Sequence, residues 1–219
     1  DGGGLYLTFK SLNKQFITVQ DIEFTNGTST EYQGTVYVSN GTNTTFLRCT
    51  VGSGTSDGLV FGNTANNFLI QDCLISQNAR YGIRFLDSGG IMQNGTITGN
   101  TVIWNDTIGI FMQGVDFFTI GTNTISWNGD SEGGRGLAIQ HSPGARGTIN
   151  FLVINNTCNY NAISGIAFSG NTAGLSCNHG TCTGNTSSYN REIGIGFSYL
   201  CYDITVDHNT CDWIGTNTG

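Results

Sequence analysis

Apolar and polar residues alternate along this chain in short runs, and each run is bounded by Gly or Asn. Alternation with a period of two is typical of β-strands, and no window of 11 residues has the apolar spacing of an amphipathic helix. The segment Ile97–Asn105 shows the pattern clearly, and Gly109-Ile110-Phe111-Met112 follows it. We therefore predict a protein that is almost entirely β.

The same pattern recurs at Ile120–Asn128, Val153–Asn161 and Cys182–Asn190. A glycine opens each Gly-Ile-like strand, and successive glycines are 24, 24, 27, 27, 29 and 29 residues apart. They are Gly34, Gly58, Gly82, Gly109, Gly136, Gly165 and Gly194. Repeats of this length bury their apolar residues by stacking on their neighbours, so the period predicts a solenoid.

A second column of equivalent positions, called the reference column here, gives the number of coils. It contains Val19, Phe46, Ile70, Ile97, Ile120, Val153, Cys182 and Val206. Eight coils stacked at about 4.8 Å form a rod about 38 Å long. Residues at the same position of successive coils then lie one above another.

Asparagine recurs three and eight residues after the reference column. The first set is Asn100, Asn123, Asn156, Asn185 and Asn209, and the second is Asn78, Asn105, Asn128, Asn161 and Asn190. A side-chain amide both donates and accepts hydrogen bonds, so a stacked Asn can bond to the coils above and below it at a sharp turn. We predict that both columns are structural.

The segments Asn123-Thr-Ile-Ser-Trp-Asn and Gly165-Ile-Ala-Phe resemble the repeat of the pectate-lyase-like and NosD-like superfamily. The resemblance extends from Phe16 to Trp213. It implies a right-handed, single-stranded parallel β-helix that forms one domain over residues 1–219, with an insertion at 129–149. That superfamily includes polysaccharide lyases, hydrolases, epimerases, phage tailspikes, adhesins and structural proteins, so the resemblance specifies the fold more narrowly than the function.

The low charge of the chain limits the classes of partner that it can bind. Only 11% of the residues are charged, the net charge is −7, and no Lys follows Lys14. A chain without a basic stripe is a poor binder of nucleic acid. No apolar run is long enough to span a membrane, and the start has neither a signal peptide nor an initiator Met, which suggests a mature product or an excised segment.

Seven Cys and seven Asn-x-Ser/Thr sequons suggest an extracellular or cell-surface protein. The sequons at Asn105 and Asn185 fall in the Asn columns, so we predict that these two are unmodified. The remaining glycosylation candidates are Asn26, Asn40, Asn43, Asn94 and Asn155.

Cys177 and Cys201 each lie five residues before the reference column in adjacent coils, so we predict that they stack and form a disulfide. A local Cys177–Cys182 bridge is the alternative. Cys49 and Cys73 also share a column, and they are either bridged or buried as free thiols. The chain has no Cys-x-x-Cys or His-x-x-x-His spacing, so we predict no metal and no cofactor.

The outward positions of the Gly-Ile-x-Phe strands contain one charge, that of Arg84. The first outward column is predicted as Val36, Val60, Arg84, Phe111, Ala138, Ala167 and Gly196, and the second as Val38, Gly62, Leu86, Gln113, Gln140, Ser169 and Ser198. This face is poor in catalytic groups and suits packing against another chain or a covering segment.

Charged residues gather instead in the longest stretch between repeats. Its candidates for catalysis are Asp130, Glu132, Arg135, His141 and Arg146. Polysaccharide lysis needs a base and a cation beside the uronate, and glycoside hydrolysis needs two carboxylates. A polysaccharide lyase, glycoside hydrolase or epimerase, or a fragment of one, that acts through the 130–146 loop is therefore the alternative function, and a solvated loop is the structural explanation. Arg80, Arg84 and Asp87 form a second charge cluster.

Aromatic residues occupy the position seven residues after the reference column in the last five coils. They are Trp104, Trp127, Tyr160, Tyr189 and Trp213. If they point inward they form a core ladder; if they point outward they form a strip suited to sugar rings or to another protein chain. Our leading prediction is a non-catalytic extracellular solenoid that is structural or contacts polysaccharide, with a polysaccharide or further copies of itself as partners.

Overall fold

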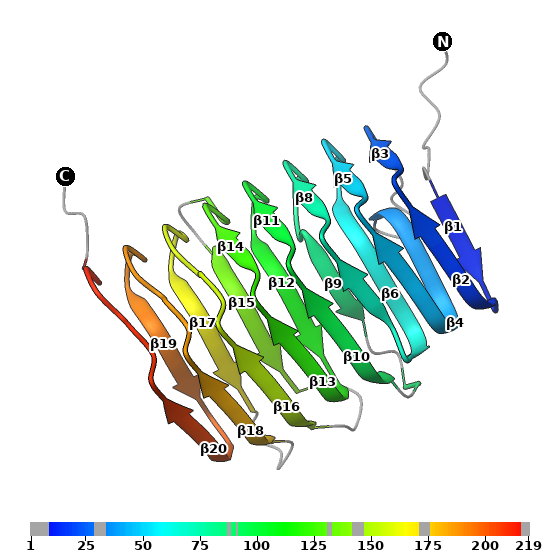
Figure 1. The fold of residues 1–219 in the computed structure, drawn as a ribbon. Helices are drawn as coiled ribbons and strands as arrows, with labels where there is room; N and C mark the ends of the chain where they lie inside the picture. Colours follow the sequence, from blue (N-terminus) through cyan, green and yellow to red (C-terminus); the bar gives the residue numbers. More distant parts are fainter. Residues whose placement is uncertain are drawn as a thin grey trace.

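The computed structural model describes residues 9–28, 34–86, 89–90, 92–130, 133–141, 147–170 and 176–215. Within these residues every regular element is a β-strand, and the strands pair in parallel between successive coils. The coils stack into a rod with the two ends of the chain at opposite ends (Figure 1). The predicted all-β, right-handed parallel β-helix is therefore confirmed.

Each coil contributes to three faces. Face one consists of β1 (Phe9–Leu12), the first half of β4 (Gly34–Leu47), the first half of β6 (Asp57–Asn66), β9 (Ile83–Leu86), β12 (Ile108–Gln113), β15 (Arg135–Gln140), β17 (Ser164–Ser169) and β19 (Ile193–Ser198). Face two consists of β2 (Gln15–Gln20), the second half of β4, β7 (Leu69–Gln71), β10 (Met92–Thr98), β13 (Val115–Gly121), β16 (Thr148–Ile154), β18 (Cys177–Thr183) and β20 (Cys201–Asp207).

Face three is made of short strands. It consists of β3 (Glu23–Thr25), β5 (Thr50–Gly52), β8 (Leu74–Ser76), β11 (Thr101–Ile103) and β14 (Thr124–Ser126), continued by single bridges at Thr157, Thr186 and Thr210. Each face thus has eight levels in the described residues, and the chain makes about seven turns between the first level and the last.

The proposed insertion at 129–149 includes one of the repeating strands. Its residues 135–140 form β15, which pairs with β12 on one side and with β17 on the other. The extra residues of this coil therefore fall in two separate segments, before and after β15.

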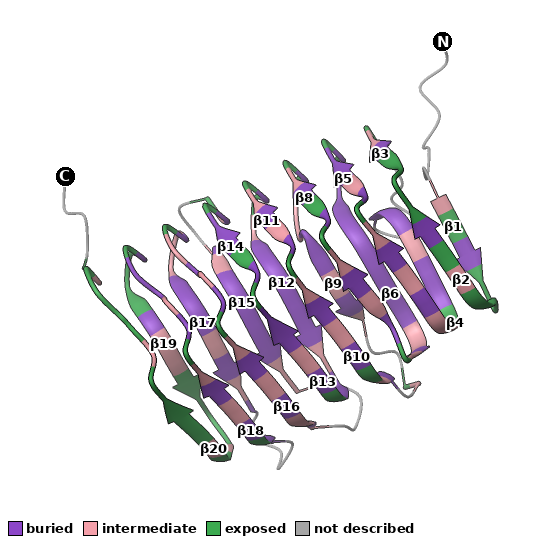
Figure 2. Ribbon diagram, in the orientation of Figure 1, coloured by how far each residue is buried: buried purple, intermediate pink, exposed green. Residues whose placement is uncertain are grey.

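The reference column points inward, as the alternation predicts. From Phe46 through Cys182 its members are buried, and they form one continuous core with the inward residues of face one, such as Ile110 and Met112. Figure 2 shows this burial along the middle of the rod, whereas β19 and β20 at the last coil are largely exposed.

The predicted outward columns of face one need a correction in the first of their coils. Gly34 pairs with Asp57 rather than Gly58, so Val36 pairs with Leu59 and both lie in the core. The outward residues at this level are Tyr37 and Ser39. The face is also less open than predicted, since Val60, Phe111 and Ala138 are buried.

Both Asn columns run through the inside of the rod. From Asn100 to Asn185, each Asn Nδ2 of the first column donates to the Oδ1 of the Asn in the next coil, for example from Asn123 to Asn156 over 2.9 Å, and to a carbonyl of the preceding coil, such as Ile97 O at 2.9 Å. The backbone N–H of Asn123 donates to the same Oδ1 of Asn156. The second column repeats the arrangement, as at Asn128 and Asn161. The structural role predicted for these residues is confirmed.

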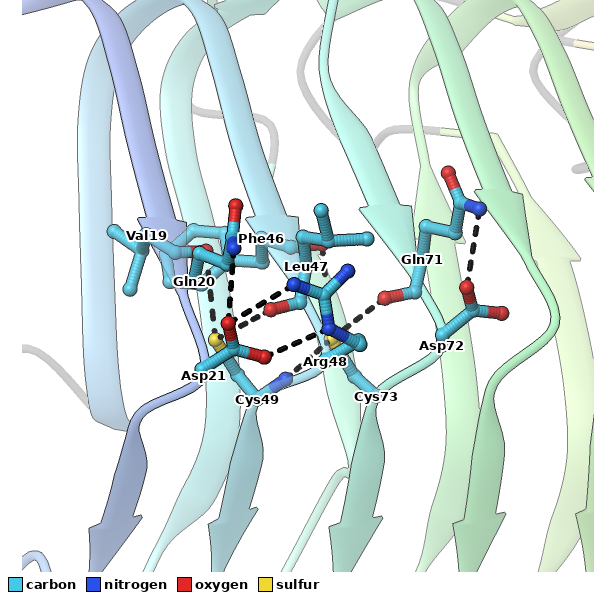
Figure 3. A network of polar contacts seen from close by, with 10 residues as sticks. All are labelled: Val19, Gln20, Asp21, Phe46, Leu47, Arg48, Cys49, Gln71, Asp72 and Cys73. Atoms are coloured by element: carbon cyan, nitrogen blue, oxygen red, sulfur yellow. Dashed lines mark hydrogen bonds and ion pairs between the residues drawn. The ribbon is translucent and has the colours of Figure 1, made fainter.

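Cysteines continue the first Asn column into the early coils. Cys73 Sγ accepts a hydrogen bond from Cys49 N at 3.4 Å and donates to Phe46 O at 3.7 Å (Figure 3). Cys49 Sγ donates to Val19 O in the same way. At the adjacent corner, Arg48 binds both carboxylate oxygens of Asp21 at 2.7 and 2.9 Å on the surface.

All seven cysteines are free thiols. Cys177 and Cys201 are partners in the register of β18 and β20, so the predicted stacking is correct, but the predicted disulfide between them is not formed. Each thiol has a hydrogen-bond partner instead: Cys201 Sγ lies 3.3 Å from Ser198 O, and the two thiols interact with each other. Cys49 and Cys73 are likewise buried free thiols.

Among the glycosylation candidates, Asn26, Asn40, Asn94 and Asn155 are exposed and Asn43 is half-buried. Asn105 and Asn185 are buried. Glycosylation at the five accessible positions stays a prediction. The described residues include no helix of a length and hydrophobicity that would cross a membrane.

Candidate functional site

The five aromatic residues of the last coils, called the aromatic ladder, lie on the outside of the rod. The exposed fractions of Trp104, Trp127, Tyr160, Tyr189 and Trp213 are 54, 50, 42, 46 and 77%. They stand at the corner where face three turns into face one, and their φ angles lie between 53° and 60°. This left-handed backbone turns each side chain away from the core, which decides between the two orientations that the sequence left open.

The same corner has the same backbone in the first three coils, where the residues are polar. Asn26, Ser53 and Gln77 hold this position with φ angles of 59°, 54° and 57°. Left-handed geometry favours Asn and costs a bulky residue about 1 to 2 kcal/mol. The corner therefore does not require aromatic side chains, and some other interaction must favour them from Trp104 onward.

Stacking between the rings supplies part of that interaction. The ring centroids of Trp127 and Tyr160 are 4.2 Å apart, those of Tyr160 and Tyr189 are 4.9 Å apart, and those of Tyr189 and Trp213 are 6.2 Å apart. The ring planes are within 7° of parallel in each pair. Face-to-face stacking covers the faces of the inner rings, so these rings present their edges to solvent.

A groove of about 490 Å³ runs along the ladder. Its lining includes Trp127, Tyr160, Tyr189 and Trp213, together with Arg191 and Ile214. Aromatic carbon makes most of this surface apolar, while phenol and indole groups add hydrogen-bond donors. An apolar groove with a few polar groups is the usual form of a ligand site.

Among the described residues that line the groove, Arg191 is the only charged one, and the carboxylates nearest to the ladder in the chain lie outside that lining. Asp106 and Asp130 follow Trp104 and Trp127 closely in the chain, and Asp212 directly precedes Trp213. Glu192 lies next to Arg191. All of these charged side chains are exposed, and Arg135, which begins β15, is half-buried.

The structure divides the predicted catalytic residues between the two ends of β15. Asp130 and Arg135 precede or begin this strand, whereas His141 follows its last residue. Six residues of extended strand separate Arg135 from His141 by about 20 Å. The backbone N–H of His141 donates to Ser169 O, and its buried Nδ1 has no hydrogen-bond partner in the described part of the chain. Glu132 and Arg146 lie outside the described residues.

The second charge cluster contains a residue that the sequence reasoning missed. Asp57 is fully buried, and Arg84 Nη1 and Arg80 Nε lie 3.0 and 3.6 Å from its carboxylate. Burial raises the pKa of Asp57, while the hydrogen bond from Arg84 opposes the rise. The guanidinium group of Arg84 also lies 4.8 Å from the centre of the Tyr81 ring. The sequence signal was the register: Asp57 aligns with Gly34 at the start of a strand. Asp87, the third predicted member, lies outside the described residues.

Comparison with known families gives one match along most of the chain. A family model described as "Periplasmic copper-binding protein (NosD)" matches residues 4–157. A comparison with curated protein sequences finds no match.

Several solved structures share the fold. The A-module of the Azotobacter vinelandii mannuronan C-5 epimerase AlgE6 superimposes with a TM-score of 0.73 at 16% identity, over 91% of this chain and 54% of that one. The periplasmic alginate epimerase AlgG gives 0.67 at 12% identity, over 92% and 46%. Pectate lyase Pel9A gives 0.55 at 13% identity, over 85% and 52%. The chain thus spans about half the length of these structures, and identities this low show the fold alone.

The copper named in the family description has no matching donor set in the described residues. They contain no group of three or more His, Cys, Asp or Glu side chains that could hold a metal ion. The Cys49–Cys73 pair is buried, and burial raises the pKa of Cys73 to about 11. Cysteine binds a metal as the thiolate, so the protonated thiol of Cys73 does not fit a copper site.

Proposed function

We propose that this chain, which belongs to the NosD family, is a polysaccharide-contacting β-helix that binds a glycan along the aromatic ladder without a catalytic step there. The observation that carries the proposal is the outward row of aromatic side chains at a corner whose backbone favours polar residues. A structural role alone would be met by Asn, Ser or Gln, as in the first three coils.

The direction of the ladder suits a linear polymer. Its members occupy successive coils, so a chain laid parallel to the rod meets one aromatic side chain per coil. Sugar rings have apolar C–H patches and polar hydroxyl groups, and the ladder offers apolar ring edges beside phenol and indole donors. Trp213 is the most exposed of the five rings in the described residues.

We also propose that the protein acts outside the cytoplasm, in the periplasm or at the cell surface. The family description supports a periplasmic site, and AlgG, which shares the fold, is itself periplasmic. Fractionation of cells that express the chain with its native flanking sequence tests the location.

Binding is tested with a panel of neutral, acidic and cationic polysaccharides, measured by affinity electrophoresis and calorimetry. We expect Trp127→Ala and Trp213→Ala each to raise the Kd about two- to tenfold, since an aromatic contact contributes roughly 0.5 to 1.5 kcal/mol. Phe117→Ala is the matched control, because Phe117 is 54% exposed with a φ of 52° but lies on the corner of face two. It should leave the Kd within twofold.

Two results would overturn the proposal. In the first, no polysaccharide binds and light scattering shows that the ladder variants abolish self-association instead, which would assign the ladder to contacts between copies of the chain. In the second, the protein epimerises or cleaves a polysaccharide, followed by NMR and by the ultraviolet absorbance of unsaturated uronate, and Arg135→Ala or His141→Ala abolishes the activity. That result would establish the enzymatic alternative.

A further inference from the structure

Two thiols lie side by side where β20 pairs with the strand of the coil before it. Cys177 begins β18 and Cys201 begins β20, and the two residues are partners in the parallel register of these strands (Figure 1). Cys177 belongs to the core and Cys201 packs against it, so both side chains point to the inside of the rod. Register partners on neighbouring strands lie about 4.8 Å apart, and a disulfide spans Cα distances of about 4.4 to 6.8 Å. The backbone therefore already has the separation that a bridge requires, although both thiols are reduced in this structure.

The two thiols differ in their access to solvent. Cys177 is fully buried, whereas Cys201 is half-buried. The hydrogen bond between the two thiols lowers the pKa of Cys201 to about 6 and raises the pKa of Cys177. The thiolate is the nucleophile in thiol–disulfide exchange, so Cys201 is the sulfur that an oxidant meets first, and Cys177 is placed to attack Cys201 afterwards.

The other cysteines lack this combination. Cys49 and Cys73 are neighbours in one column, but both are buried, and burial raises the pKa of Cys73 to about 11. Cys158 and Cys211 share a column but lie two coils apart, about 9.6 Å at the strand spacing, which is too far for a direct bond. Cys182, in the coil between them, belongs to the reference column.

We propose that Cys177 and Cys201 are a redox-sensitive pair, which a small-molecule disulfide such as oxidised glutathione converts to a disulfide bond that ties β20 to the preceding coil. The sulfur of Cys201 attacks one sulfur of the oxidant, so a mixed disulfide forms, the disulfide of the oxidant breaks and one glutathione thiolate leaves. Cys177 then gives up its proton and attacks the sulfur of Cys201, and the second glutathione leaves as a thiolate. Two protein thiols are thus oxidised to one disulfide, the oxidant is reduced to two glutathione molecules, and the protons of the protein thiols pass through solvent to the leaving thiolates.

The bond acts on a weakly buried part of the rod. Among the described strands, β20 is at the end of its sheet, where it pairs with β18, and most of its residues are exposed. Elements with few buried apolar contacts open locally at the lowest free energy. A disulfide at the first residue of β20 restricts the opened state of this strand, so it disfavours the opening. This inference stands independently of glycan binding by the ladder.

The test treats the reduced, full chain with oxidised glutathione at about pH 7, blocks the remaining thiols by alkylation and maps the disulfides by mass spectrometry of peptides. We expect a bridge between Cys177 and Cys201 that dithiothreitol removes. Amide hydrogen exchange in β20 should become at least about tenfold slower on oxidation.

Two variants of the same coil separate this pair from the other thiols. Cys201→Ser removes the attacking sulfur, so it should form no bridge, and hydrogen exchange in β20 should not change when the oxidant is added. Cys211→Ser is the matched control, because Cys211 is an exposed thiol that is not the register partner of Cys177. It should behave like the parent chain, whose disulfide map does not depend on either variant.

Three results would overturn the proposal. In the first, Cys201 is alkylated or keeps its glutathione while Cys177 stays a free thiol, so the buried sulfur does not reach its partner. In the second, the bridge joins Cys182 and Cys211 instead. In the third, the bridge between Cys177 and Cys201 forms but hydrogen exchange in β20 is unchanged, which would show that the bond does not restrain this coil.

Discussion

At the scale of single residues, Asn and Cys fill the same place in this fold. Asn100 Nδ2 donates to Ile70 O of the preceding coil at 2.9 Å, and its Oδ1 accepts from Cys73 N at 2.9 Å. Cys73 makes the corresponding pair of bonds with one sulfur atom, at 3.7 and 3.4 Å. Sulfur is a weak donor and a weak acceptor, so the thiol reproduces the pattern of the amide with longer, weaker bonds.

Replacement of Cys73 by Asn should therefore extend the Asn column. We expect Cys73→Asn to retain the free energy of unfolding or raise it by about 1 kcal/mol, because two weak bonds become ordinary hydrogen bonds. Cys73→Ala should lower it by about 1 to 3 kcal/mol, because the N–H of Cys49 and the carbonyl of Phe46 lose their partner. Urea denaturation measures both. Equal losses for the two variants would show that the thiol is held by packing instead.

At the scale of the repeating element, the Gly at the start of the face-one strands from Gly58 to Gly165 is explained by the Asn of the next coil. A Cβ on Gly109 would lie 2.8 Å from Asn128 Nδ2 and 2.7 Å from Gly136 O, and a Cβ on Gly82 would lie at similar distances from Asn105 and Gly109. The side-chain amide thus packs where a larger residue would need room. The Gly and Asn columns are therefore structurally dependent on each other, although the sequence shows them only as two separate repeats.

We expect Gly109→Ala to lower the free energy of unfolding by about 1 to 3 kcal/mol, since overpacking of a tight interior costs this much. The displaced amide of Asn128 also loses its alignment with Asn161. Gly133→Ala is the control, because a Cβ there meets nothing within 4 Å. Thermal and urea unfolding compare the two, and an equal, small effect at both positions would contradict the account.

The repeat could be predicted from the sequence because equivalent residues recur in every coil. Phe46, Ile97 and Asn156 lie where their columns place them, and one periodic rule accounts for each. The side of Trp104 could not be predicted, because it depends on a positive φ angle that alternation does not reveal.

Local irregularities were also missed. β4 continues around the corner from face one to face two, and its register shifts between Ser39 and Gly41, which moved the predicted outward column by one residue. The partnership of Asp57 with Arg84 joins positions 27 residues apart, and neither residue recurs at its position in the other coils. A polar contact that is made in only one coil does not appear as a repeat, so the periodicity of the sequence cannot reveal it.

At the scale of the whole molecule, buried thiols couple folding to alkaline pH. Burial raises the pKa of Cys73 to about 11 and that of Cys182 to about 12, and it also raises the pKa of Cys158. In the unfolded chain these thiols ionise near pH 8.5. Above that pH the folded protein binds more protons than the unfolded chain, so stability is fully present below about pH 8.5 and is lost as pH rises toward the folded pKa values.

We expect the free energy of unfolding to fall between about pH 9 and 11, with each thiol contributing up to about 1.4 kcal/mol per pH unit. Cys182→Val removes one thiol and places in the reference column a residue that it already holds at Val153 and Val206. In this variant the free energy of unfolding should fall less steeply with pH, by the contribution of one thiol. Urea denaturation with a reductant present, repeated across this range, gives the slope; an unchanged slope in the variant would contradict the coupling.

The residue at the ladder corner changes from Gln77 in the third coil to Trp104 in the fourth, and the aromatic ladder begins there. The three coils before Trp104 have an amide or hydroxyl side chain at that corner, and the later coils have an aromatic ring. Every coil adds the same rise, so under the proposed glycan binding the number of aromatic coils would set the length of polymer that the ladder contacts. Gain or loss of one coil would change the length of the ladder by the rise of one coil. The length could therefore change between related proteins through the number of repeats, with the structure of each repeat unchanged.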